Sequence, residues 1–325
     1  MPGFTTHYIM GMKAYNDLPA NALKHIISKY RWLYQLGLQG PDIFFYYIPI
    51  LRHRDYRNVG SYMHEHHVQE FFINYLKQTS RISSKQQRGQ ALAYFCGYIC
   101  HYIGDSICHP FVYGRIQYDI ANPSMEHHGL HAELENDIDA LLLRQYKKKK
   151  PSEFNQAATI CLNGMEAQFI SRLLSTCINE TYYPITYRNN FQVSPSMVHR
   201  SIVALRFGCR TLSDPSGRKR VGLELMESIL HKKPAASRKL VTDQVINPRK
   251  SLNLDHETWC NPWKKQMASD RSFLELFYQS MAKCKLVYYL INQSITSGLP
   301  PEEMDFQPAI DELGNYSYHS GLPVS

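Results

Sequence analysis

The sequence lacks the features that mark a membrane-spanning or exported chain. Its longest apolar run, Ile43–Leu51, is about half of the roughly 20 residues that a helix needs to cross a bilayer. The first residues, MPGFTTHYIMGMKAYND, contain no charged segment followed by an apolar one, as a secretory signal peptide would. The eight cysteines form no CxxC pair, and Cys96, Cys100 and Cys108 are expected to be reduced packing residues. We therefore predict a cytoplasmic protein with no transmembrane segment.

The sequence also has little that indicates β-structure. No stretch alternates apolar and polar residues convincingly, whereas apolar residues recur at three- and four-residue spacing along most of the chain. Strands are therefore expected to be few or absent. The spacing predicts helices over 20–36, 61–78, 87–109 (ended by Pro110), 127–146, 152–178, 195–212, 218–231 and 269–296.

Length and composition are those of a globular chain. The 325 residues can bury a sizeable core, and the contents of 44% hydrophobic and 20% charged residues exclude a disordered protein. Scattered prolines and glycines make two segments irregular. We predict a single all-α domain over 1–325, with a loop-rich insertion near 233–268 and an irregular C-terminal tail, 298–325. The formal net charge of +8 favours anionic partners such as phosphates, anionic lipid headgroups or nucleic acid.

One predicted helix carries three metal-type side chains at regular spacing. In HYIGDSICH, His101, Asp105 and His109 stand four residues apart, and each such step advances about 40° around a helix, so they share one face. His131 and Glu135 repeat the spacing on the next predicted helix. Imidazole and carboxylate suit zinc, and such pairs on adjacent helices can build a site for several ions. Spacing alone leaves two interpretations open: metal ligands, or polar groups satisfied within a helical core.

Three residues nearer the start of the chain extend the pattern. Asp42 follows a Gly-Pro turn in GPDIFF and precedes aromatic residues, where a buried carboxylate is costly unless a cation compensates it. His64 in GSYMHEHH and His7 in TTHY offer further imidazoles. His67 lies on the same helical stripe as His64 and is an alternative to it; we favour His64.

Some neighbouring residues have less specific interpretations. Asp139, one turn beyond Glu135, could orient a histidine as a hydrogen-bond acceptor. The aromatic run that includes Phe44, Phe45 and Tyr46 is expected to pack in the core, although it could instead line a pocket for a headgroup or a base. His319 has no partner pattern and is interpreted as structural or exposed.

Taken in order, eight residues match the pattern of a known family. They are His7, Asp42, His64, His101, Asp105, His109, His131 and Glu135. With them, the chain resembles the bacterial zinc-dependent phospholipase C family, and MPGFTTHY, GPDIFFYY and HYIGDSICHPF are most similar to its intracellular branch. It is similar also to the related S1/P1-type nucleases. The resemblance implies an all-α fold, a multi-helix bundle of the phospholipase C and P1 nuclease type.

The resemblance implies a site for up to three zinc ions. A first ion would be held by Asp42, His64, His101 and Asp105. A second would be held by His109, His131 and Glu135. The third would take His7, with Asp105 as a bridge, and the amine and carbonyl of the N-terminus. Where secreted relatives expose a tryptophan, this chain begins Met-Pro, so Pro2 becomes the expected terminal ligand once Met1 is removed.

The same resemblance implies phosphoester hydrolysis. A zinc-bound hydroxide would cleave a phosphodiester in a phospholipid or in a smaller substrate. Asp42 is the predicted catalytic residue, because it could orient or deprotonate the attacking water. One alternative is an S1/P1-like nuclease or nucleotidase acting on nucleic acid. Another is a non-catalytic helical metal-binding protein.

Overall fold

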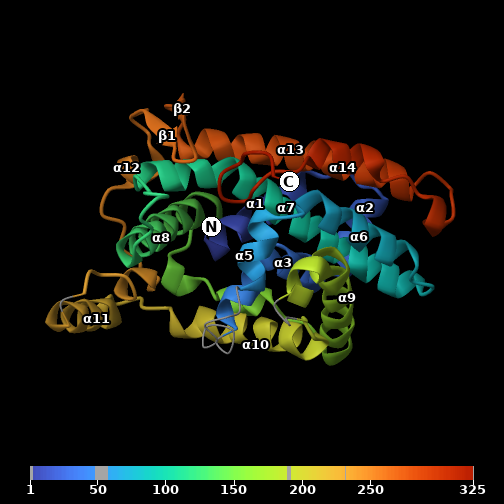
Figure 1. Ribbon diagram of the computed structural model, residues 1–325, viewed down its shortest axis with the longest axis horizontal. Helices are drawn as coiled ribbons and strands as arrows, with labels where there is room; N and C mark the ends of the chain where they lie inside the picture. Colours follow the sequence, from blue (N-terminus) through green and yellow to red (C-terminus); the bar gives the residue numbers. More distant parts are fainter. Residues whose placement is uncertain (1–2, 48–57, 189–191, 231, 325) are drawn as a thin grey trace.

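The computed structural model describes residues 3–47, 58–188, 192–230 and 232–324, and within them helices dominate (Figure 1). The first half contains α1 (Phe4–Asp17), α2 (Ala22–Lys29), α3 (Arg31–Gly37), η1 (Gly40–Tyr46), α5 (Val59–Glu65), α6 (Val68–Ser80), α7 (Lys85–Arg115) and α8 (Met125–Lys147). The second half contains η2 (Pro151–Glu153), η3 (Gln156–Thr159), α9 (Gly164–Arg188), α10 (Pro195–Thr211), α11 (Arg218–Ile229), η4 (Ser237–Lys239), α12 (Pro248–Leu252), β1 (Trp259–Asn261), β2 (Lys264–Ser269), α13 (Phe273–Ile295), η5 (Pro301–Glu303) and α14 (Gln307–Leu313). The all-α prediction is confirmed, since β1 and β2 form only a short antiparallel hairpin.

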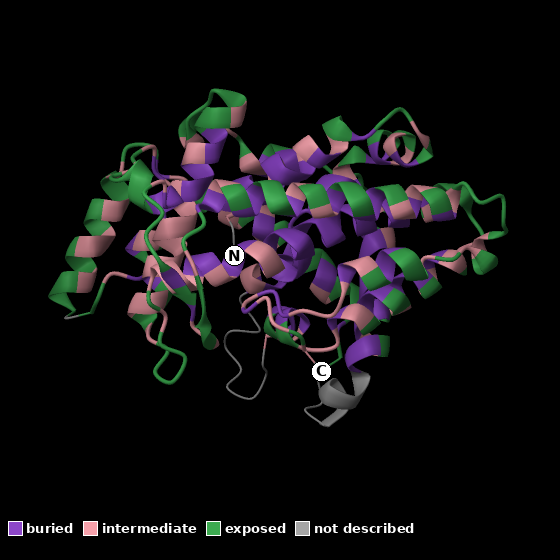
Figure 2. Cartoon of the chain, turned by 90° about the horizontal axis from the view of Figure 1, so that it is seen from above, coloured by how far each residue is buried: buried purple, intermediate pink, exposed green. Residues whose placement is uncertain are grey.

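The long helix α7 lies at the centre of the bundle (Figure 1) and is buried along most of its length. Figure 2 shows the buried residues gathered in the middle of the molecule. It crosses α3 at two glycines, where the backbones touch. A Cβ added at Gly97 would lie 2.1 Å from the Tyr34 carbonyl oxygen, and one added at Gly37 would lie 2.2 Å from that of Tyr94. This contact needs residues without side chains, and it brings the end of α3 and the start of η1 against the middle of α7.

Three buried tyrosines carry their hydroxyl groups into this core and donate them to backbone carbonyls. Tyr34 donates to the Gly11 carbonyl at 2.6 Å, and Tyr288 donates to that of Cys96 at 2.8 Å. Tyr102 donates to the Leu313 carbonyl at 3.2 Å and so ties the C-terminal segment to α7. The abundant tyrosine is therefore compatible with a dry core, because each of these hydroxyls has a partner.

Several helix boundaries differ from those that periodicity predicts. The predicted helix 20–36 is two helices, because Tyr30 leaves helical geometry between α2 and α3. The predicted helix 61–78 is likewise divided into α5 and α6. The break lies at His66 and His67, and the backbone of His67 is in the left-handed region with φ of 49°. The helix predicted over 152–178 starts only at Gly164, after two short 3₁₀ turns.

Pro110 does not end α7, as the sequence pattern predicts, but lies inside it. The helix continues to Arg115 because its last turns are packed from outside. The ring of Phe111 contacts those of Trp259 and Phe273, with centroids 5.6 and 5.7 Å away. This burial offsets the backbone hydrogen bond that proline cannot donate.

The two segments predicted to be irregular contain short elements. Residues 233–268 include η4, α12 and most of the hairpin, and the tail includes α14. None of the helices in the described part of the chain is long and apolar enough to cross a bilayer. All eight cysteines, each within the described residues, are free. The single-domain organisation and the cytoplasmic location stay predictions.

Candidate metal centre

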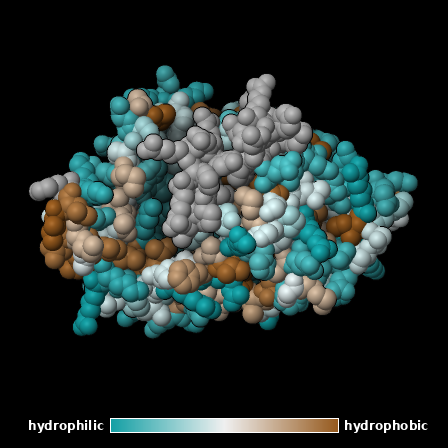
Figure 3. Space-filling model, turned by 60° about the horizontal axis from the view of Figure 1, so that its bottom comes forward, coloured by the Kyte–Doolittle hydropathy of each residue, from teal (hydrophilic) through white to brown (hydrophobic). Residues whose placement is uncertain are grey.

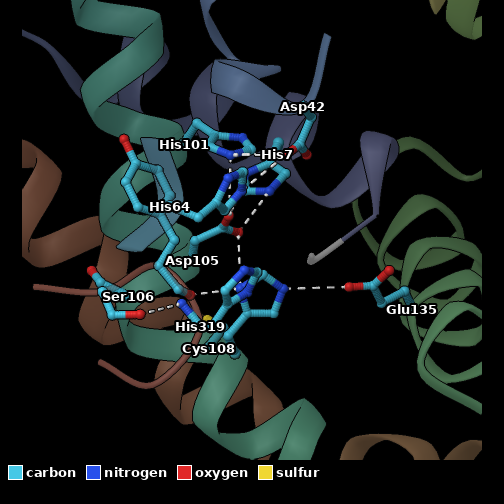
Figure 4. A network of polar contacts seen from close by, with 12 residues as sticks. His7, Asp42, His64, His101, Asp105, Ser106, Cys108, Glu135 and His319 are labelled. Atoms are coloured by element: carbon cyan, nitrogen blue, oxygen red, sulfur yellow. Dashed lines mark hydrogen bonds and ion pairs between the residues drawn. The ribbon is translucent and has the colours of Figure 1, made fainter. Parts of the chain in front are cut away.

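Four side chains from three separate elements meet at the middle of α7 (Figure 4). One ligand atom from each of Asp42, His64, His101 and Asp105 lies within 4.8 Å of the others, and all four side chains are buried. The elements η1 and α5 supply the first two, and successive turns of α7 supply the others. His64 Nε2 lies 3.2 Å from Asp42 Oδ1, and His101 Nε2 lies 3.1 Å from Asp105 Oδ2. We call this set the first cluster.

Asp105 joins the first cluster to residues on either side of it. Its Oδ1 atom lies 3.1 Å from His7 Nε2 and 3.7 Å from His109 Nδ1. The His7 ring, from α1, stacks on that of His101 at a centroid distance of 3.9 Å. A single fully buried carboxylate therefore has imidazoles from α1 and α7 around it, as a bridging ligand would.

A second cluster lies one turn further along α7. It consists of His109 with His131 and Glu135 from α8, again with one ligand atom from each within 4.8 Å of the others. His131 Nε2 lies 2.7 Å from Glu135 Oε1, and His109 Nε2 lies 3.5 Å from the same oxygen. The structure thus brings together the pairs that the sequence places on adjacent helices.

Backbone carbonyls orient three of these histidines. The Nδ1 atoms of His64, His101 and His109 lie 2.6, 3.1 and 2.7 Å from the carbonyl oxygens of Gly60, Leu38 and Tyr318, respectively. A carbonyl only accepts, so each Nδ1 carries a proton, and in the neutral ring Nε2 keeps its lone pair. In their neutral forms all three histidines therefore present Nε2 to the clusters, which is the arrangement that a metal needs.

The polar atoms that face the two clusters fit a metal ion. Several buried side-chain nitrogen and oxygen atoms of the described residues make no hydrogen bond. They are His7 Nε2, Asp42 Oδ1, His64 Nε2, His101 Nε2, both Asp105 oxygens and His109 Nε2. Each such group costs about 1–3 kcal/mol if it stays unsatisfied. Imidazole nitrogen and carboxylate oxygen are the usual zinc ligands in proteins, so the donor set matches zinc.

Burial and neighbouring charges shift the pKa values of the histidines and carboxylates in the centre. Burial lowers the pKa values of His7, His109 and His131 and so favours the neutral ring that binds metal. Burial opposes the charge on Asp105, but His101, His109 and His7 together hold its pKa well below the usual range. Burial raises the pKa of Glu135 and so opposes its ionised form, which a metal ion there would favour.

His101 titrates differently from the other histidines. Burial by itself lowers the pKa of His101, but the charges of Asp105 and Asp42 outweigh it and raise the value to about 9. The two carboxylates therefore favour a cation at this point of the first cluster, and a zinc ion would take the place of the proton.

Asp139 plays a different part from the one that the sequence suggests. It accepts no hydrogen bond from a histidine; its carboxylate accepts from Thr5 N at 2.9 Å, Thr6 N at 2.8 Å and Thr6 Oγ1 at 2.7 Å. Burial raises its pKa to about 6, although these donors oppose the rise. Asp139 thus caps the first turn of α1 and holds His7, the next residue, towards Asp105.

Replacing Asp139 with alanine is expected to lower the free energy of unfolding by about 2–4 kcal/mol, since buried amides of α1 lose their acceptor. Urea denaturation measures this. Asp137→Ala is the matched control, because Asp137 lies on the same helix and accepts one hydrogen bond, from Ser251 at 2.8 Å. Equal losses in the two variants would contradict the assignment of Asp139 as the cap of α1.

The C-terminal segment contributes residues that local patterns did not reveal. His319 is interpreted from the sequence as structural or exposed. In the structure its ring stacks on that of His64 at a centroid distance of 4.9 Å, and its Nδ1 atom lies 3.2 Å from the Tyr113 hydroxyl. Tyr318 donates its N–H to the His64 carbonyl at 2.9 Å, besides its contact with His109. No spacing in the sequence signals these contacts, because the segment is irregular and far along the chain.

The structure separates the two candidate histidines of the HEHH stretch. His64 is fully buried in the first cluster, whereas the His67 side chain is 40% exposed and pairs with Glu70 at 2.8 Å. Pro2, the expected ligand at the N-terminus, lies outside the described residues.

A cavity of about 360 Å³ opens beside the centre. Asp42 and Glu135 belong to both the clusters and the cavity wall, and Phe45, Tyr46 and Lys239 also line the cavity. From the sequence, Phe44, Phe45 and Tyr46 are expected to pack in the core. Phe44 does so, whereas Phe45 and Tyr46 are half-buried and line the cavity. A small substrate would therefore meet the candidate ligands Asp42 and Glu135, the rings of Phe45 and Tyr46, and the cation of Lys239 here.

Comparison with known proteins supports the assignment of these residues to a zinc site. A family model described as zinc-dependent phospholipase C matches residues 6–183, a stretch that contains both clusters and His7. Comparisons with curated proteins and with solved structures give no match.

Proposed function

Because the chain belongs to the zinc-dependent phospholipase C family, we propose that it hydrolyses phospholipids on the diacylglycerol side of the phosphate. The family implies a hydrolase, and the buried clusters of aspartate, glutamate and histidine support a zinc-dependent phosphoesterase. The observation that carries the proposal is the pair of adjacent metal-type clusters joined through Asp105 and open to one cavity.

We propose that the first cluster holds one zinc ion and the second cluster another. A third ion between His7, Asp105 and the Pro2 terminus stays a prediction. When bound, clustered zinc ions lower the pKa of a water molecule towards neutrality and offset negative charge on the phosphate oxygens. The protein's own side chains orient the water, accept its proton and bind the substrate.

Asp42 is the proposed catalytic base. Its Oδ1 atom lies 3.2 Å from His64 Nε2 in the first cluster, and its side chain also forms part of the cavity wall. A carboxylate in this position can orient the attacking water and accept its proton. Lys239 lines the same cavity, where its charge favours an anionic phosphate, and Phe45 and Tyr46 offer apolar surface to a headgroup.

The experiment that tests the proposal compares wild-type protein with His64→Ala and His67→Ala. We expect wild-type protein, purified without chelator, to carry at least two zinc ions per chain, one for each cluster, and to release phosphocholine from phosphatidylcholine. His64→Ala is expected to lose zinc and about 10²–10³-fold in rate, because an incomplete ligand shell leaves the ion poorly held. His67→Ala should change neither quantity, since His67 contacts Glu70 at the surface. Plasma mass spectrometry and an assay of water-soluble phosphate measure the two effects.

Two outcomes would redirect the proposal. Zinc-loaded protein that spares every phospholipid but digests single-stranded DNA would favour the nuclease alternative. Protein that binds no more than one zinc ion and hydrolyses no phosphodiester would favour the non-catalytic metal-binding alternative.

A further inference from the structure

Helix α11 is attached to the rest of the protein by its polar side. Arg220 forms ion pairs with Glu133 of α8 and, at 2.9 Å, with Glu224. Glu227 accepts hydrogen bonds from the backbone N–H groups of Ala235 and Ala236, at 3.0 and 2.7 Å. Charged side chains thus face the protein, where a surface helix normally presents its apolar stripe.

The apolar side of the same helix faces solvent. Val221, Leu225 and Ile229, spaced four residues apart, are 66%, 62% and 67% exposed, and Met226 and Leu230 beside them are also exposed. No residue of α11 is buried (Figure 2). Figure 3 shows strongly hydrophobic surface gathered at the end of the molecule that α11 occupies. A contiguous patch of this kind on a soluble protein marks an interaction site.

Basic residues lie at both ends of this apolar face. Arg218 and Lys219 begin the helix, and Lys232 and Lys233 follow it; all four are exposed. An apolar helix face next to Lys and Arg is the pattern of a helix that lies in the interface of a membrane with anionic lipids. A second protein copy fits less well, since five apolar side chains on one short helix are far fewer than the roughly 20–30 residues per side of a stable protein interface.

We propose that the exposed face of α11 docks on the surface of a membrane containing anionic phospholipids. The side chains of Val221, Leu225, Met226, Ile229 and Leu230 enter the apolar boundary of the membrane. Arg218 and Lys232 meet the lipid phosphates. Each apolar group that leaves water contributes to binding in proportion to its area, and the cations add an attraction that salt weakens.

Docking here also bears on the active centre, a link that rests on the proposed function. Glu133, the partner of Arg220, lies on α8 between His131 and Glu135 of the second cluster. The chain that follows α11 supplies Lys239 to the cavity wall. A membrane bound at α11 would therefore contact an element that is joined to α8 by an ion pair and to the Lys239 segment by the chain itself, and both border the site.

Sedimentation with vesicles of equimolar phosphatidylcholine and phosphatidylglycerol tests the proposal on the zinc-loaded full chain. The wild-type protein is expected to bind these vesicles, and Leu225→Gln with Ile229→Gln to bind them about 100-fold more weakly, about tenfold for each side chain. Glutamine keeps the helix, because it is a good helix former and both positions are exposed. Met165→Gln with Leu286→Gln is the matched control, since these residues are 78% and 44% exposed on α9 and α13. That control should bind like wild type.

Two more measurements separate the possible explanations. Arg218→Gln with Lys232→Gln should reduce binding severalfold and make it less sensitive to salt. All α11 variants should hydrolyse a soluble chromogenic phosphodiester at the wild-type rate, so a chain with no hydrolytic activity would undermine the proposed function without touching the docking proposal. Wild-type protein that ignores the vesicles, or Leu225→Gln with Ile229→Gln that binds them as well as wild type, would overturn the proposal. So would a wild-type dimer that the same double variant converts to monomer, because α11 would then contact a second copy.

Discussion

Replacing Asp105 with asparagine is expected to reduce hydrolysis by at least about 10³-fold and to release most of the bound zinc. Among the described residues, Asp105 is the carboxylate that contacts histidines of both clusters and His7: it lies 3.1 Å from His7, 3.1 Å from His101 and 3.7 Å from His109. Asparagine keeps the shape of the side chain but removes its charge and one acceptor oxygen. Several buried imidazoles would then converge on a neutral amide, which cannot neutralise a divalent cation.

The effect is measured as zinc per chain and as the rate on a soluble phosphodiester. Asp137→Asn is the matched control on α8, where the carboxylate accepts from Ser251 and belongs to neither cluster. It is expected to keep wild-type zinc content and rate. Circular dichroism separates loss of metal from loss of fold. A folded Asp105→Asn variant with full zinc content and full activity would show that the two clusters do not act through this residue.

Removal of zinc by a chelator is expected to lower the melting temperature by about 6 °C. An ion at about 1,000 times its dissociation constant stabilises the folded state by about 4 kcal/mol, and with an unfolding entropy of about 2.1 cal/mol/K per residue each kcal/mol corresponds to about 1.5 °C in a chain of 325 residues. Without an ion, the buried oxygens and nitrogens around Asp105 face one another without hydrogen bonds. Chelation should therefore destabilise the middle of α7 and the elements that meet it.

Differential scanning calorimetry with and without chelator, followed by zinc replacement, measures this change. The Asp105→Asn variant serves as the control, since a chain that has already lost its zinc should respond little to the chelator. His67→Ala should respond like wild type, because His67 lies at the surface. An unchanged melting temperature in the wild-type protein would mean that the clusters are stable without metal, and the zinc assignment would fail.

The sequence alone was sufficient for the parts of the site that lie within single helices. A helix advances a constant angle per residue, so the spacing of His101, Asp105 and His109 already places them on one face. The same reasoning holds for His131 and Glu135. The order of these residues also carried the family resemblance, which the match over residues 6–183 confirms. The assignment to the intracellular branch of that family stays a prediction.

Local patterns were less successful where tertiary packing competes with them. Pro110 has the chemistry that ends helices, yet α7 continues through it because Phe111 packs on two aromatic rings from distant segments. The periodicity of 61–78 predicts one helix, but His67 adopts a left-handed conformation and divides it. That break lies just beyond His64, which is buried in the first cluster while His67 reaches solvent.

Only the tertiary structure decided which distant residues meet at the centre and which face of α11 turns outward. Asp139 caps α1 from across the bundle, and His319 reaches His64 from the far end of the chain. The sequence predicts a helix over 218–231 but not that Arg220 and Glu227 bind inward while Leu225 stays in solvent. Helix geometry is local and repeats from residue to residue, so it can be predicted from spacing. Contacts between elements depend on how all of them pack together, and no short stretch of sequence contains that information.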